Sequence, residues 1–253
     1  MNSNLSRKLC GVIVIFSVLF TPVVAIFGPF QNGDNRTPTE LFLPADYAFS
    51  IWGVIYLGLL ELGVWLLLPR QGANPRANSA APWLAVTALF NVLWILLAGS
   101  SRTLPWTVPT LIVMEVSAWL AYFRLGVHWN ATLPRAERLL YVPLQIYVGW
   151  LSVATVANSA TALSVLGWGG FGIDDVSWTL IMLFVATGLA YAVGRAAGQD
   201  NVYRAVFVWA FVAITVAQWS VPVVAWTAAV MSALVLLMIV RPPRKILRTA
   251  DAS

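Results

Sequence analysis

Charged residues and metal-binding side chains are scarce in this sequence. Only 10% of the 253 residues are charged, against about 25% in an average globular protein, and 60% are hydrophobic. A chain of this length and composition cannot be a soluble domain, so we place it in a membrane. Its one cysteine, Cys10, excludes an internal disulfide. Its one histidine, His128, leaves a structural metal site without enough ligands, and we expect no required cofactor.

Catalytic and nucleic-acid-binding patterns are missing as well. The chain shows no acid–base pair that would support catalysis, so we expect it not to be an enzyme. The glycine-rich segment 167–175 lacks the lysine and the strand-to-helix setting of a phosphate loop, and we interpret it as an interfacial turn. The net charge of +5 lies on no soluble basic domain, which indicates contact with anionic lipid and no nucleic-acid partner.

What the chain has instead is a series of apolar runs of roughly 20 residues, with short polar breaks between them. Runs of this length are typical of membrane-spanning helices, whereas the strands of a membrane barrel alternate over about ten residues. We predict eight spans, at residues 10–27, 48–68, 82–100, 104–123, 139–163, 176–194, 202–219 and 221–240. The expected fold class is all-α, a polytopic transmembrane helical bundle.

The positions of the basic residues agree with eight spans. When the N-terminus is placed inside, every lysine and arginine except Arg36 and Arg102 falls on the cytoplasmic side, as the positive-inside rule requires. We therefore predict a multi-pass protein of the bacterial cytoplasmic membrane with both termini inside. A cleaved signal peptide is the alternative for the first run, because Arg7 and Lys8 precede it, but a length of about 18 residues favours a retained helix.

Two carboxylates lie at membrane depth, Glu61 in the second run and Glu115 in the fourth. A charge at that depth is costly unless it is paired, protonated or facing water. A neutral carboxyl that is hydrogen-bonded between helices is the more common explanation. Proton coupling by Glu61 and Glu115 is the functional alternative.

Three of the predicted helices carry aromatic and polar side chains at helical spacing. The stripes are Phe49, Trp52 and Tyr56; Thr87, Phe90, Asn91, Trp94 and Ala98; and Tyr147, Trp150, Ala154, Asn158 and Thr161. Residues three or four apart share one face of a helix, so each set forms a single stripe. If the stripes converge, they form an aromatic-walled pocket for a flat apolar ligand. Ordinary packing between helices is the alternative that spacing alone leaves open.

Three segments resemble the successive motifs of the TspO/MBR family, which includes the translocator protein and the bacterial tryptophan-rich sensory proteins. They are residues 49–56 (FSIWGVIY), 89–94 (LFNVLW) and 150–158 (WLSVATVAN), in the family's order and spacing. The resemblance covers roughly residues 8–163. It implies a TspO/MBR-like transmembrane domain with a five-helix core at residues 1–165. About three additional transmembrane helices and a basic cytoplasmic tail would follow at residues 166–253.

The resemblance also implies a pocket for a porphyrin or haem-like ligand. By motif position its residues are Trp52, Tyr56, Asn91, Trp94, Trp150, Ala154 and Asn158. The outside segment 28–46 would correspond to the family's lid over that pocket. Since the chain has one histidine, we expect stacking to hold a porphyrin. The segment after Asn158 lacks the Tyr and Arg of the family's sterol-recognition segment, so the resemblance does not imply sterol binding there.

Two functional hypotheses follow. The leading one is a membrane protein that binds a flat hydrophobic ligand in an aromatic pocket and senses, sequesters or transports it. The rival is a proton-coupled secondary transporter of a small metabolite that uses Glu61 and Glu115. Membrane lipid and the small ligand are the expected partners, and the choice between a monomer and a homodimer is left open.

Overall fold

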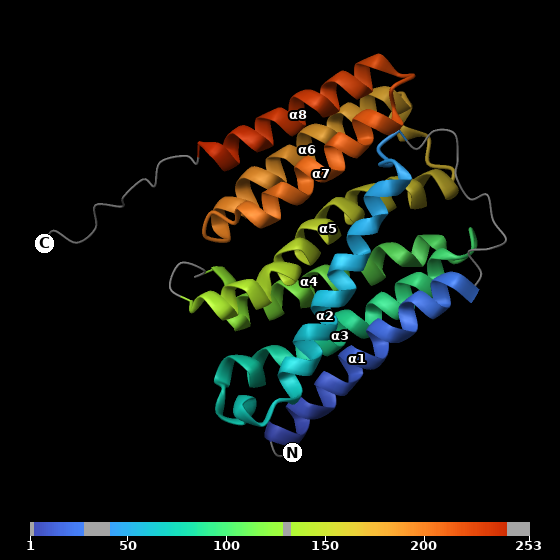
Figure 1. The fold of residues 1–253 in the computed structure, drawn as a ribbon. Helices are drawn as coiled ribbons and strands as arrows, with labels where there is room; N and C mark the ends of the chain where they lie inside the picture. Colours follow the sequence, from blue (N-terminus) through green and yellow to red (C-terminus); the bar gives the residue numbers. More distant parts are fainter. Residues whose placement is uncertain (1–2, 28–40, 129–132, 242–253) are drawn as a thin grey trace, which may run out of the picture.

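The computed structural model describes residues 3–27, 41–128 and 133–241, and this part of the chain is helical throughout apart from short connections (Figure 1). The α-helices in these ranges are α1 (Ser3–Phe27), α2 (Ile51–Leu67), α3 (Pro75–Ala98), α4 (Thr107–Leu125), α5 (Arg135–Val165), α6 (Asp175–Ala196), α7 (Asn201–Ala217) and α8 (Pro222–Val240). Short 3-10 helices lie between them: η2 (Asp46–Ser50), η3 (Pro69–Ala73), η4 (Leu104–Trp106) and η6 (Gly170–Gly172). The predicted all-α helical bundle is confirmed. Residues 28–40 of the predicted lid and residues 242–253 of the predicted basic tail lie outside the described residues.

Within the described residues, seven helices are long and apolar enough to cross a membrane, as expected of an integral membrane protein. The exception is α7, whose 17 residues would span about 25 Å, short of a hydrocarbon core of about 30 Å. This helix packs against α5, α6 and α8, and its Phe207, Phe211 and Ile214 are fully buried. The seventh predicted span, 202–219, is therefore a shorter helix packed against three others, and the inside location of both termini stays a prediction.

Hydrogen-bonding caps decide where several helices begin. α3 begins at Pro75 rather than at the predicted Pro82, which lies inside the helix. The Asn74 side chain accepts hydrogen bonds from the backbone N–H groups two and three residues later, at 3.0 and 3.3 Å, and so caps the helix before its apolar part starts. Asp174 and Asp200 cap α6 and α7 in the same way. Hydrophobicity predicted the membrane span but not the polar first turns.

The helices form two groups (Figure 1). In the first group α3 packs against α1 and α4, while α2 contacts α1 and α5; in the second, α8 packs against α6 and α7. The main contact between the groups is α5 with α7. Gly149 of α5 permits this close approach, because a Cβ there would lie 3.0 Å from the Cβ of Val206 on α7. Gly58 of α2 likewise lies against Pro143 of α5, where a Cβ would come within 1.9 Å.

Polar side chains tie α7 to α4 and α5 along a line that we call the α7 seam. The seam consists of Glu115, Tyr122, Gln145, Ser152, Asp200 and Tyr203. The Asp200 carboxylate is 5% exposed and accepts from the Tyr122 hydroxyl and the Gln145 amide, each at 2.8 Å. The Tyr203 hydroxyl donates to Ser152 (3.2 Å), whose hydroxyl donates to Glu115 (2.7 Å). A connected network of this kind orients the second helix group on the first.

Candidate functional site

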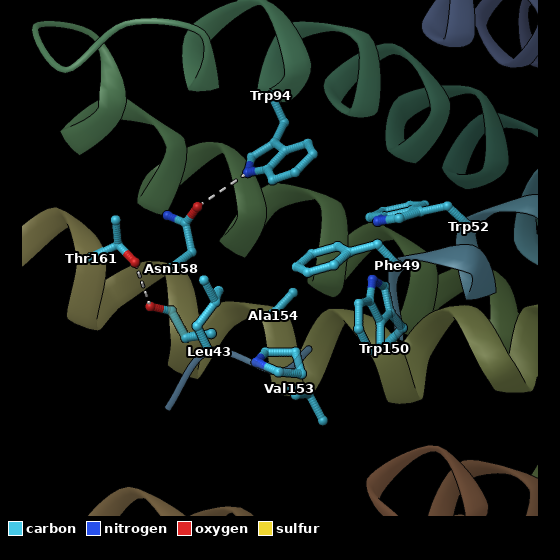
Figure 2. A pocket seen from close by; sticks show the side chains of 11 residues that line it. Leu43, Phe49, Trp52, Trp94, Trp150, Val153, Ala154, Asn158 and Thr161 are labelled. Atoms are coloured by element: carbon cyan, nitrogen blue, oxygen red, sulfur yellow. Dashed lines mark hydrogen bonds between the residues drawn. The ribbon is translucent and has the colours of Figure 1, made fainter. Parts of the chain in front are cut away.

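The stripes on α2, α3 and α5 face one another and leave a hollow of about 110 Å³ between them (Figure 2). The lining residues are Leu43, Pro44, Phe49, Trp52, Trp94, Trp150, Val153, Ala154, Ala157, Asn158 and Thr161. α5 supplies most of them, because positions three or four apart from Trp150 onward fall on one face of that helix. The chain before α2 adds Leu43, Pro44 and Phe49.

Aromatic rings form one wall of this hollow. The Trp52 and Trp94 indoles stack with centroids 6.0 Å apart and planes 27° apart. Phe49 meets Trp150 edge to face at 5.7 Å, and Figure 2 shows its ring next to both Trp52 and Trp150. Nearly parallel indole planes and a perpendicular ring present both faces and edges, which suits a flat apolar molecule.

The side-chain polar groups of Trp94, Asn158 and Thr161 in the lining are hydrogen-bonded to protein atoms. The Trp94 indole N–H donates to the side-chain oxygen of Asn158 (3.4 Å), and the Asn158 amide donates to the Thr107 hydroxyl (2.6 Å). The Thr161 hydroxyl donates to the backbone oxygen of Ala157 (3.2 Å). Among the described residues, none of those lining the hollow is charged. The hollow therefore offers ring faces and methyl groups, and no cation for a ligand carboxylate.

Among the described residues, no side chain that ordinarily binds haem iron faces the hollow. Its described lining contains no His, Cys, Met or Tyr, the side chains that ordinarily bind haem iron. Elsewhere in the described ranges, no group of three or more His, Cys, Asp or Glu side chains is placed to hold a metal ion. A bound tetrapyrrole would therefore depend on contacts with its ring rather than on a bond to a central metal.

Five of the seven residues predicted for the pocket line the hollow, namely Trp52, Trp94, Trp150, Ala154 and Asn158. The other two, Tyr56 and Asn91, lie behind Trp52. The Tyr56 ring stacks on Trp52 at 5.3 Å, and its hydroxyl donates to the side-chain oxygen of Asn91 (3.4 Å). Asn91 is 3% exposed and also accepts from Thr21 of α1 (3.3 Å). These two residues support the aromatic wall, because helical spacing predicts a shared face but not how far along it the hollow extends.

Four lining residues were not named as pocket residues from the sequence. Val153 and Ala157 continue the helical spacing of Trp150 and were detectable from it. Leu43 and Pro44 carry no periodic signal, but they belong to the described end of segment 28–46, which the family resemblance placed over the pocket.

The two acids at membrane depth lie apart. The Glu115 carboxylate accepts from Ser152 (2.7 Å) and Thr155 (2.9 Å), which fits a carboxyl hydrogen-bonded between helices. Both hydroxyls lie on the face of α5 opposite the hollow, at 100° per residue. Glu61 lies on the exposed face of α2 beside Leu57, and it makes no hydrogen bond or ion pair with any described residue.

The model of a family described as TSPO-like protein matches residues 8–241. The match includes α2 to α8 and most of α1, so it continues past the predicted boundary at residue 165. The division into residues 1–165 and 166–253 stays a prediction. No curated protein and no solved structure matches the chain.

Proposed function

Since this chain belongs to the TSPO-like family, we propose that its aromatic hollow binds a flat hydrophobic ligand of the porphyrin or haem type. The binding would serve sensing, sequestration or transport of that ligand in a bacterial cytoplasmic membrane. One observation carries the proposal: three indoles and Phe49, from three separate segments, surround a single hollow with no charged group in its described lining. Stacking on flat rings is the interaction that this arrangement favours.

The size of the hollow limits how such a ligand binds. A cavity of roughly 150 Å³ holds benzene, whereas drug-sized ligands bind in clefts of about 300–1,000 Å³. The hollow of about 110 Å³ therefore admits one edge of a tetrapyrrole but not the whole ring. In the proposed mode, one edge enters beside Trp52, Trp94 and Phe49. The charged substituents stay at the mouth, because no cation meets them inside.

An absorbance titration of the purified protein with protoporphyrin tests this proposal. We expect Trp150→Ala and Trp52→Ala each to weaken binding at least about tenfold, since truncating a buried aromatic contact costs about 2 kcal/mol. Trp226→Ala is the matched control, because Trp226 on α8 is 65% exposed and does not line the hollow. It should leave the affinity within about twofold of the parent.

A metal comparison in the same titration tests the mode of binding. Because no described lining residue is an iron ligand, haem and metal-free protoporphyrin should bind with similar affinity. Unchanged affinity in both Trp52→Ala and Trp150→Ala would refute the proposed site. A strong preference for haem would refute stacking as the source of the affinity.

A second candidate function is proton-coupled transport of a small metabolite. The observation that favours it is the position of Glu115, midway along α4. Its carboxyl accepts hydrogen bonds from two hydroxyls on the face of α5 that points away from the hollow. A change in its protonation would alter those bonds and so act on α5. Glu61 makes no comparable contact, so the candidate depends on Glu115. Loss of proton-driven uptake by vesicles carrying Glu115→Gln, with uptake kept in Glu61→Gln, would support it.

A further inference from the structure

The rim of the hollow is attached to α7, which belongs to the second helix group. The rim is residues 41–50, the described chain before α2, and its Leu43, Pro44 and Phe49 line the hollow. Its backbone is bonded to α7 at two points. Ala45 N–H donates to the backbone oxygen of Ala213 (3.1 Å), and the Trp209 indole N–H donates to the backbone oxygen of Ala48 (3.1 Å).

Ring packing and burial strengthen this attachment. Tyr47 of the rim meets Trp209 edge to face, with centroids 5.4 Å apart. Ala48 and Ala213 are fully buried, and a rim that moved away would take these acceptors from two donors, the Ala45 backbone N–H and the Trp209 indole N–H. Trp209 and Ala213 are four residues apart and so lie on one face of α7. That face acts as the support for the rim.

α7 is itself held in place independently of the rim. Its first turn carries Asp200 and Tyr203 of the α7 seam, and its middle packs closely on Gly149 of α5. Movement of the rim away from α7 therefore breaks the contacts of Ala45, Tyr47 and Ala48 without requiring α7 to move. The hinge of any such movement lies at the rim, and α7 is its fixed side.

We propose that α7 holds this rim over the hollow, and that Trp209 is the positioning residue that sets how readily the hollow opens. A helix of the second group thereby controls access to a site that the first group builds. The part of this inference that concerns ligand rests on the proposed function, because the rim borders the hollow into which one edge of a tetrapyrrole would enter. The attachment of the rim is a property of the protein alone.

Thiol labelling tests the attachment without a ligand. In full-length protein carrying Cys10→Ser, a Leu43→Cys substitution places the only thiol on the lining of the hollow. We expect Trp209→Phe, which keeps an aromatic ring but removes the donor to Ala48, to raise the rate of maleimide labelling about fivefold, the value of one hydrogen bond. Trp226→Phe makes the same chemical change on an exposed part of α8 and should leave the rate unchanged.

Two further variants separate opening of the rim from general loosening. Ser50 is exposed at the end of the rim, so a thiol placed there by Ser50→Cys is accessible whether the rim is open or closed. Its labelling rate should be the same with and without the Trp209→Phe substitution. If Trp209→Phe does not fold, Tyr47→Leu removes the ring contact from the rim side and should also speed labelling at position 43. Equal labelling at position 43 in the parent, Trp209→Phe and Tyr47→Leu proteins would overturn the proposal.

Protoporphyrin dissociation then tests the part that concerns ligand. Trp209→Phe should speed dissociation by about the factor seen in labelling, while Trp226→Phe should not change it. If labelling accelerates and dissociation does not, the rim is not on the path of the ligand and that part is wrong. If protoporphyrin binds to none of the proteins, the proposed function fails, and the labelling rates alone still decide whether α7 holds the rim.

Discussion

Two regions with opposite uses of polar side chains meet on the two sides of α5. On one side, polar side chains that line the hollow bond to each other, as the Trp94 indole does to Asn158, and a space is left between the aromatic rings. On the other side, the α7 seam bonds one helix to the next through buried groups such as Asp200 and Tyr203. One membrane helix therefore lines the hollow with one face and joins the two helix groups with the other.

The largest expected effect comes from Asp200→Asn. Asparagine keeps the cap of α7 but cannot accept from both the Tyr122 hydroxyl and the Gln145 amide as the carboxylate does. We expect a loss of about 2–3 kcal/mol in unfolding free energy, because a buried donor is left without its charged partner. Denaturant or thermal unfolding of the protein in detergent measures it.

Asp174→Asn is the matched control for this change, because Asp174 caps α6 in the same way at an exposed position. The Asp174→Asn variant should unfold at the same midpoint as the parent protein. Similar losses in the two variants would show that the loss at Asp200 comes from the charge at a helix N-terminus and not from the bonds to Tyr122 and Gln145, and the contrast between the seam and the hollow would lose its main support.

An intermediate effect is expected from Glu115→Gln. The amide keeps one acceptor for the hydroxyls of Ser152 and Thr155, so stability should fall by about 1 kcal/mol. Protoporphyrin affinity should stay within about twofold, since the contacts lie on the face of α5 away from the hollow. Glu61→Gln, which alters an exposed residue without described partners, should change neither. A tenfold loss of affinity in Glu115→Gln would show that the two faces of α5 are coupled.

The smallest effect is expected from Thr161→Val within the hollow. The Thr161 hydroxyl is bonded to the backbone of its own helix and contributes little that a ligand can use, so titration should give an unchanged affinity. Asn158→Leu provides the contrast, because it removes the acceptor of the Trp94 indole and should weaken binding about fivefold. If Thr161→Val weakens binding as much as Asn158→Leu does, the Thr161 hydroxyl contacts the ligand directly.

The sequence predicted much of the wall of the hollow and little of its rim. Trp52, Trp94 and Asn158 were found because helical spacing and the three motifs place them on facing stripes. Tyr56 and Asn91 share those stripes but lie one layer deeper, and spacing carries no information about depth. The caps at Asn74 and Asp200 were visible as residue types, yet a hydrophobicity criterion begins a span only where the apolar residues begin.

The amino-acid order by itself determined that this chain is a bundle of membrane helices with aromatic stripes, because hydrophobic length and helical period are local properties that need no knowledge of neighbours. Only the tertiary structure decided that Leu43 and Pro44 line the hollow and that Trp209 bonds the rim at Ala48, 161 residues away in the chain. Close approach at Gly58 brings α2 to α5, and close approach at Gly149 brings α5 to α7. Neither of these close contacts between helices can be read from a periodic pattern in the sequence.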